Sequence, residues 1–211
     1  MRMCSKPPMA MADKPCAEYA VRNSAPILEI LRREFAHASR VLEIGSGTGQ
    51  HAVAFTAALD HLYWQTSDLD ENHAGIRAWI GESGSANIAS PLSMDVRTAS
   101  IEADAYDAAY SSNTAHIMGI DAVEKMFMLV GRGLEAGGVF CLYGPFRRDG
   151  EFNTPSNAAF DTNLRERDPV MGIRDIETLD EFAAAAEMRR ERFYAVPSNN
   201  NVAVWVRGSD A

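Results

Sequence analysis

Apolar and polar positions along the chain follow two periods, which predict short strands and amphipathic helices in turn. Compact apolar runs predict buried strands at Val41–Ile44, Leu62–Ser67, Ile88–Met94, Tyr106–Tyr110 and Val139–Tyr143. Helical periodicity or alanine-rich composition predicts helices at Ile27–Ser39 after Pro26, Gln50–Leu59, Glu71–Ile80 closed by Gly81, and Ala122–Gly131. Strands that alternate with helices form a parallel sheet covered on both faces, so we expect an α/β fold.

The last third of the chain has a different pattern. Residues 146–171 are polar and lack a period, which predicts a long loop or a lid. Thr178–Glu181 has the S/T-x-x-E form of a capping box, so a helix is expected to start there. Arg192–Val196 and Val202–Val206 alternate on either side of a Pro-Ser-Asn-Asn-Asn turn, which predicts a β-hairpin.

Composition limits the size and the partners of the protein. A chain of 211 residues with 46% hydrophobic and 23% charged residues has enough apolar side chains for one packed core. No repeat or linker divides it, so we expect a single domain over residues 1–211, with residues 1–12 flexible. The formal net charge of -9 repels polyanions, so nucleic acid and anionic membranes are poor candidate partners.

Cysteine and histidine patterns give no sign of a disulfide framework or a metal site. The three cysteines are odd in number and have no C-x-x-C spacing, and the five histidines are scattered. The start of the chain has no apolar segment of the signal-peptide kind, and no later stretch has membrane-spanning length. We therefore expect a cytoplasmic protein without a metal.

Three glycines at alternate positions follow the first strand. Gly45, Gly47 and Gly49 allow a sharp bend with no Cβ in the way of a flat ligand, which predicts a nucleoside site. A dinucleotide fingerprint, G-x-G-x-x-G, would need a third glycine where Gln50 stands, and no catalytic Tyr-x-x-x-Lys is present. A nicotinamide-dependent oxidoreductase is therefore the weaker alternative.

Carboxylates stand at the ends of three successive predicted strands. Glu43 precedes the glycines, where it suits a cationic ligand better than a pyrophosphate. Asp68 ends the second strand, at a spacing where a carboxylate accepts from both ribose hydroxyls. Asp95 ends the third, where it can accept from an adenine amino group while Val96 offers a backbone amide. These residues should meet, because ligands of open α/β sheets bind at the carboxyl ends of the strands.

Val41–Gly49 resembles motif I of class I S-adenosylmethionine (SAM)-dependent methyltransferases. The wider chain is similar to one family of that class, the methyltransferase-like proteins of type twenty-six. The matching stretches are Arg22-Asn23, Pro26–Leu28, Gly47–Ala52, Ser67-Asp68, Ser112–Ile117, Tyr143–Phe146, Arg167–Asp175 and Pro197–Asn200. One departure is Met171, where we expect the family to carry a tryptophan. The resemblance implies a Rossmann-like fold with a mostly parallel seven-stranded sheet and a C-terminal antiparallel hairpin.

By the same resemblance, SAM is the cofactor and S-adenosylhomocysteine (SAH) its product. The residues assigned to cofactor binding are Glu43, Gly45, Ser46, Gly47, Thr48 and Gly49 at the methionine end, Asp68 and Leu69 at the ribose, and Asp95 and Val96 at the adenine. Arg22 and Asn23, expected just before the first helix, either clamp the cofactor carboxylate or form an ordinary helix N-terminus.

The resemblance also places candidate catalytic and substrate residues. His116 is the candidate general base and Asn113 would orient substrate or cofactor, although His116 equally suits a hydrogen bond to the backbone. Tyr143 and Phe146 are candidate aromatic walls of a substrate pocket, with plain packing at the sheet end as the alternative. We expect a small-molecule substrate; a non-catalytic SAM-binding or scaffold protein is the alternative function.

Overall fold

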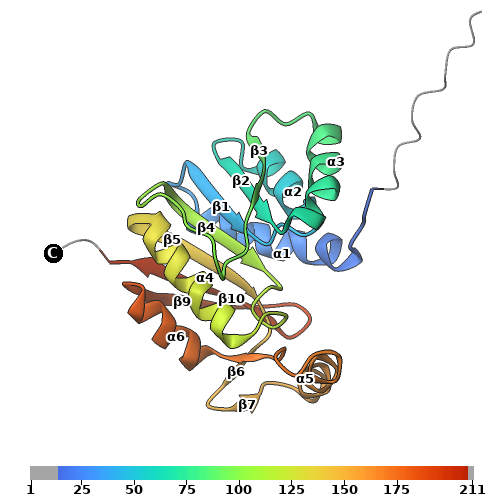
Figure 1. The fold of residues 1–211 in the computed structure, drawn as a ribbon, viewed down its shortest axis with the longest axis vertical. Coiled ribbons are helices and arrows are strands. Elements are labelled where there is room, and N and C mark those ends of the chain that lie inside the picture. The colour runs from blue at the N-terminus through green and yellow to red at the C-terminus, as the bar shows by residue number, and fades with distance from the viewer. Residues whose placement is uncertain (1–13, 209–211) are drawn as a thin grey trace, which may run out of the picture.

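The structure, a computed structural model, describes residues 14–208, so the expectation for residues 1–12 falls outside it. A seven-stranded sheet crosses the molecule in the order β3-β2-β1-β4-β5-β10-β9 (Figure 1). The strands are β1 (Arg40–Ile44), β2 (Tyr63–Asp68), β3 (Ile88–Ser93), β4 (Tyr106–Ser112), β5 (Leu134–Gly144), β9 (Met188–Val196) and β10 (Asn200–Arg207). The first five are parallel, and β10 pairs antiparallel with β5 and β9. The mostly parallel sheet and the C-terminal hairpin are thus confirmed.

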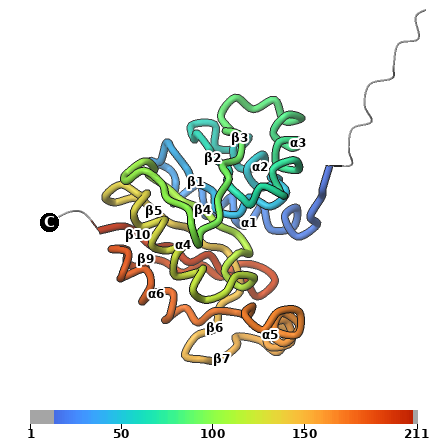
Figure 2. Tube along the Cα trace, in the orientation of Figure 1, coloured from blue at the N-terminus to red at the C-terminus, as the bar shows by residue number. Residues whose placement is uncertain are grey.

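Helices cover both faces of this sheet (Figure 2). They are α1 (Glu18–Glu34), α2 (Gln50–Ala58), α3 (His73–Ser83) after the short 3-10 helix η1 (Asp70–Asn72), α4 (Ile120–Gly133), α5 (Pro155–Arg167) and α6 (Ile176–Ala185). Side chains of α1 and α2 pack on one face around Trp64 and Tyr110. Those of α4 and α6 pack on the other around Phe140 and Trp205. Alternate residues of β1, such as Val41 and Leu42, therefore enter different cores.

Helix α1 begins at Glu18, so the predicted start after Pro26 is wrong. Pro26 lies inside α1, although proline removes one backbone donor. The helix buries residues on both sides of Pro26, such as Ala20 and Ile27. Arg22 and Asn23 consequently lie within α1, Arg22 exposed and Asn23 buried, and the reading of them as a helix N-terminus is also wrong.

Two other helix ends differ from their predicted positions. The helix α3 continues past Gly81 to Ser83, because the left-handed residue that closes it is Gly84, with φ 65°. The helix α6 starts at Ile176 with Asp175 at its N-cap, three residues before the predicted capping box at Thr178. In both cases the sequence holds two residues that suit the helix end, Gly81 and Gly84 for α3 and Asp175 and Thr178 for α6, only three positions apart.

Residues 146–171 are largely regular, so the prediction of a long loop is wrong. They form β6 (Phe146–Arg148), β7 (Glu151–Phe152) and α5, and β8 (Arg174–Asp175) completes a small sheet in the order β7-β6-β8. The buried residues of α5 are Asn157, Asp161 and Leu164, two of them polar, which is why no hydrophobic period marked it. Its start signal was present: Thr154 caps the Asn157 amide at 3.3 Å, and Pro155 follows at the first position.

Within residues 14–208, no helix combines the length and the apolar character that crossing a bilayer requires.

Candidate functional site

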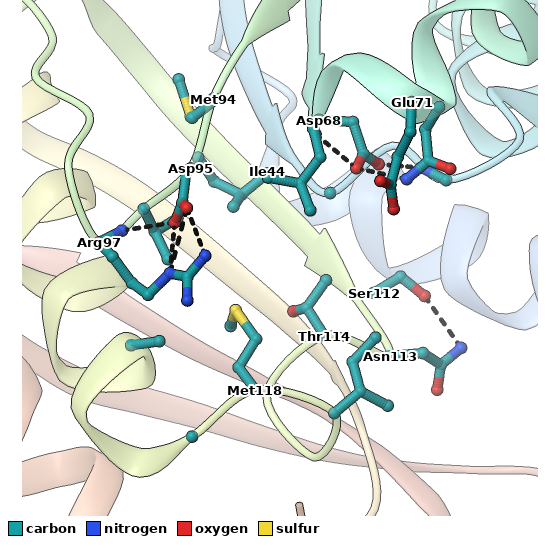
Figure 3. Close-up of a pocket in the computed structure, with 18 of the residues that line it drawn as sticks. Ile44, Asp68, Glu71, Met94, Asp95, Arg97, Ser112, Asn113, Thr114 and Met118 are labelled. Carbon is teal, nitrogen blue, oxygen red and sulfur yellow. Dashed lines mark hydrogen bonds and ion pairs between the residues drawn. The ribbon is translucent and has the colours of Figure 1, made fainter. Parts of the chain in front are cut away.

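A pocket of about 660 Å³ opens at the carboxyl ends of β1–β4. Figure 3 shows Ile44 between Asp68 on one side and Asp95 on the other, with Thr114 and Met118 across from them. The predicted site residues that line the pocket are Gly45, Gly47, Asp68, Leu69, Asp95, Val96 and Asn113. The fold therefore brings together residues that lie as much as 68 positions apart in the sequence, from Gly45 to Asn113.

The glycine bend uses its glycines for different reasons. All three have left-handed φ values, 70° at Gly45, 59° at Gly47 and 86° at Gly49. A Cβ at Gly45 would lie 2.6 Å from Cγ2 of Thr114, and one at Gly49 would lie 3.1 Å from Cα of Ile76. A Cβ at Gly47 would meet no atom within 4 Å, although this residue lines the pocket. Gly45 and Gly49 thus permit close packing of the chain, whereas Gly47 leaves space open in the pocket.

Asp68 links the glycine bend to the end of β2. Its Oδ2 accepts a hydrogen bond of 2.7 Å from the amide of Gly47, and its Oδ1 accepts from the Leu69 amide and from Nδ2 of Asn72, both at 2.7 Å. A carboxylate has about four acceptor positions, so Oδ2, with one donor, can take a further hydrogen bond. Asp68 is therefore held rigidly while it keeps capacity for a ligand hydroxyl.

Glu43 lies beneath the bend and does not line the pocket. Its Oε2 accepts from Oγ of Ser46 at 2.7 Å and from Nε1 of Trp64 at 3.0 Å. Burial raises the pKa of Glu43 to about 7, although these two hydrogen bonds oppose the shift. Glu43 thus joins the bend to the sheet, and its raised pKa makes its carboxyl titrate near neutral pH.

Asp95 forms a two-pronged ion pair that the sequence did not suggest. Nε of Arg97 lies 2.9 Å from Oδ1 of Asp95 and Nη2 lies 2.6 Å from Oδ2, and hydrogen bonding by Arg97 lowers the pKa of Asp95 to about 2. Both side chains line the pocket (Figure 3). An arginine two residues after the strand-end aspartate is the signal that could have revealed the pair.

The loop after β4 forms the opposite wall. Asn113 has the left-handed φ of 58°, its amide donates to the Tyr143 carbonyl at 2.9 Å, and its Nδ2 donates to Oγ of Ser112 at 3.3 Å. Asparagine adopts this conformation more readily than most non-glycine residues, and its two hydrogen bonds hold it there. The loop also contributes Thr114, Ile117 and Met118 to the pocket.

His116 does not line this pocket. It is 6% exposed, its ring meets that of Phe160 edge-on at 5.4 Å, and its carbonyl accepts from the Gly172 amide. Burial, and then the nearby charge of Arg174, lower the pKa of His116 to about 4, so its imidazole is neutral at pH 7.

The other predicted residues lie outside the lining. Tyr143 is 1% exposed among the aromatic side chains of the α1 face, and burial raises its pKa to about 12. Phe146 lines a second pocket of about 670 Å³ between β6, β7 and β9. Five more predicted residues do not line the first pocket: Arg22, Asn23, Ser46, Thr48 and Gly49, the last of which is the N-cap of α2.

Sequence reasoning missed the outer rim of the pocket. Tyr19 reaches it from the first turn of α1, and Asp168 and Val170 reach it from the segment that follows α5. The segment predicted as a lid thus contributes to the pocket only at its end.

A family model described as "Protein of unknown function (DUF938)" matches residues 14–207. The chain belongs to this family. The DUF938 match covers both the glycine bend and the hairpin, so one family accounts for every element of the fold.

Several solved structures similar to this DUF938 chain are named as methyltransferases. Mitomycin 7-O-methyltransferase MmcR has a TM-score of 0.78 at 16% identity, covering 90% of this chain and 54% of that one. An O-methyltransferase family protein from Burkholderia thailandensis has 0.77 at 13%, covering 92% and 59%. Human N-acetylserotonin methyltransferase in complex with SAM has 0.76 at 12%, covering 91% and 53%. This chain spans between 53% and 59% of their lengths. The similarity shows that it has the Rossmann-like class I methyltransferase fold.

Proposed function

We propose that this protein is a SAM-dependent methyltransferase that acts on a small molecule. The observation that carries the proposal is that Asp68 and Asp95, at the ends of neighbouring strands, face one pocket beside a glycine bend with free space at Gly47. Ligands of open α/β sheets bind at this edge. The names of the similar structures, one of them determined with SAM, support the same cofactor.

The residues of the pocket suit the parts of SAM. Asp68 would accept from the ribose hydroxyls, because its Oδ2 keeps a free acceptor position. The amide of Val96 and the carboxylate of Asp95 would face the adenine, and Ile44 and Met94 offer it apolar surface. The bend would receive the methionine end at Gly47, where a Cβ would meet no atom within 4 Å.

Bound SAM would supply a methyl group: an acceptor lone pair forms the bond to the methyl carbon, the carbon–sulfur bond breaks, and sulfur keeps the electron pair. The protein residues would orient the acceptor and exclude water, from which much of the rate of such a transfer can come. Asn113 lines the pocket and would orient the acceptor or the cofactor. His116 is neutral at pH 7, as a base must be, but it does not line the pocket, which makes a positioning role the better proposal.

Calorimetry with SAM, SAH and NAD tests the cofactor, and transfer of labelled methyl from SAM into a metabolite extract tests the activity. We expect SAM and SAH to bind and NAD not to bind. Binding without any labelled product would favour the non-catalytic alternative, whereas failure of SAM and SAH to bind at millimolar concentration would overturn the proposal. Asp68→Ala should weaken SAM binding by about 1–3 kcal/mol, roughly 5- to 150-fold in Kd, because ribose hydroxyls lose their acceptor.

Within the class, we propose membership of the methyltransferase-like proteins of type twenty-six. Support comes from the late motifs, since Pro197–Asn200 forms the β9–β10 turn that contacts α5: Asn153 and Asn157 both donate to the Asn199 carbonyl. The turn motif therefore has a structural role, which is to hold Asn153 and Asn157 at the start of α5.

A further inference from the structure

Three apolar side chains that line the pocket are exposed to solvent at its mouth. Tyr19 and Ile117 are each 47% exposed and Val170 is 56% exposed, and all three line the pocket. They come from α1, from the loop after β4 and from the segment after α5, which are separate parts of the chain. Exposed apolar surface concentrated at a pocket mouth marks a binding surface for an apolar group.

The charged side chains of the same pocket are almost all acidic. The carboxylates in its lining are Asp68, Glu71, Asp95, Asp121 and Asp168. Arg97 is the single cation among the described residues that line it. Its Nε and Nη2 both donate to the carboxylate of Asp95. An anionic group at this mouth would meet repulsion from these carboxylates and no free cation.

We infer that the outer part of the pocket, at Tyr19, Ile117 and Val170, binds the methyl acceptor, and that this acceptor has an apolar body and no anionic group. Aryl or alkyl alcohols, thiols and amines belong to this class, and carboxylates and phosphates do not. The inference rests on the proposed function, because it assigns the strand ends to the cofactor and leaves the rim for the acceptor.

The position of Val170 allows the charge preference to be changed with little disturbance of the fold. Its side chain is exposed and belongs to neither core cluster. Its backbone is held on both sides: the amide donates to Oδ1 of Asp168 at 3.1 Å, and the carbonyl accepts from Nη2 of Arg174 at 2.7 Å. Val170→Arg would add a cation to the rim. Val21→Arg is a matched control, since Val21 is 65% exposed on α1 and does not line the pocket.

The test measures binding to the SAH-saturated protein of probes paired by size: para-cresol with para-hydroxybenzoate, and benzylamine with para-aminomethylbenzoate. In the unchanged protein, the member without a carboxylate should bind at least about tenfold more tightly, equivalent to about 1.4 kcal/mol. Val170→Arg should reduce or reverse this ratio, and Val21→Arg should leave it unchanged.

Several results would overturn the inference: carboxylate probes that bind equally well, an equal response to both arginine variants, or no binding of any probe. These failures differ from failure of the proposed function, which would appear earlier as the absence of SAH binding to the protein without probes.

Discussion

Glu43 and Asp68 end neighbouring strands, yet their surroundings give the two carboxylates different properties. Asp68 receives three donors, two of them backbone amides, at the edge of the pocket. Glu43 is 2% exposed and its pKa is raised to about 7 by burial. The same functional group, a carboxylate, therefore serves as a ligand-facing acceptor in one place and as a buried, titrating link in the other.

The raised pKa of Glu43 predicts a pH-dependent loss of stability. Its carboxyl binds its proton more tightly in the folded state, so its contribution is complete below about pH 4.5 and is lost as the pH rises to about 7. The free energy of unfolding of Glu43→Gln relative to the unchanged protein should rise over this range by roughly 3 kcal/mol. Urea unfolding of both proteins at pH 5 and pH 8 measures the difference.

Comparing the two proteins removes the contributions of other groups. His51 and His116 have pKa values lowered to about 4 by burial, so their neutral forms stabilise the fold increasingly as the pH rises from about 4 to 6.5, the opposite sign. The unchanged protein and Glu43→Gln both contain these histidines, so their contribution cancels in the comparison. A difference between the two proteins that stays constant with pH would show that Glu43 is ionised at its ordinary pKa.

Substitution of Gly47 should affect both the stability of the fold and the affinity for the cofactor. An alanine there would adopt a left-handed φ of 59° with its Cβ in open pocket space, which costs roughly 1–2 kcal/mol of stability. Because the proposed cofactor needs that space, Gly47→Ala should also weaken SAM binding by about tenfold or more. Gly137→Ala is the control: φ is 81°, a Cβ there also meets nothing within 4 Å, and the residue lies outside the pocket. Equal SAM affinity in the two variants would contradict the assignment of the bend.

The residues at the strand ends were predictable because their positions follow from the sheet alone. Parallel strands place their carboxyl ends at one edge, so Asp68 and Asp95 had to meet once the strands were recognised. Partners that depend on side-chain direction were not predictable. Arg97 lies on a loop, and the orientation of His116 depends on packing against Phe160, 44 residues later in the chain.

At the scale of elements, Arg174 joins the two outer walls of the pocket. Its guanidinium is buried and donates to three backbone carbonyls: those of Ala115, at 3.0 Å, and Met118 in the loop after β4, and that of Val170 at 2.7 Å. Arginine suits this task because its planar donors bind several acceptors at once, which the single ammonium of lysine does not match. The residue therefore couples the segment after α5 to the loop that carries Asn113 and His116.

This coupling predicts that Arg174→Met raises the pKa of His116. The positive charge of Arg174 is the second cause, after burial, of the lowered pKa, so its removal eliminates one cause and leaves the other. Arg174→Lys keeps the charge and should leave the pKa near 4. NMR titration, with the His116 signal identified from its loss in His116→Gln, measures both. A methionine variant with an unchanged His116 pKa would show that the arginine charge does not reach the imidazole.

The elements that were predicted poorly are those whose reason for folding lies in other parts of the chain. Helix α5 buries Asp161, which accepts from the Ile173 amide at 2.6 Å and from Nε of Arg165 at 2.7 Å. A hydrophobic period cannot detect a helix that is held by such polar contacts. The strands β1 and β5 were predicted well because burial on both faces gives them largely apolar runs, Val41–Ile44 and Val139–Tyr143.

At the scale of the molecule, the charge distribution adds to the local contacts. The net charge of -9 and the acidic pocket lining together favour a cationic ligand over a neutral one of the same shape. SAM and SAH form such a pair, because methyl transfer removes the positive charge from sulfur. The single-domain organisation over residues 1–211 stays a prediction at this scale.

The summed field can be distinguished from the nearest carboxylates by its response to salt. Between about 0.1 M and about 1 M salt the screening length falls from about 10 Å to about 3 Å, which weakens distant charges far more than close or buried ones. We therefore expect SAM affinity to fall more steeply than SAH affinity, with their Kd ratio changing by roughly two- to fivefold. Calorimetric titration of both ligands at the two salt concentrations measures the ratio, and SAH itself controls for salt effects on the shared adenosyl and amino-acid groups. A preference for SAM that is independent of salt would assign it to short-range contacts, and equal affinities at low salt would mean that the acidic surface does not act on the bound sulfur.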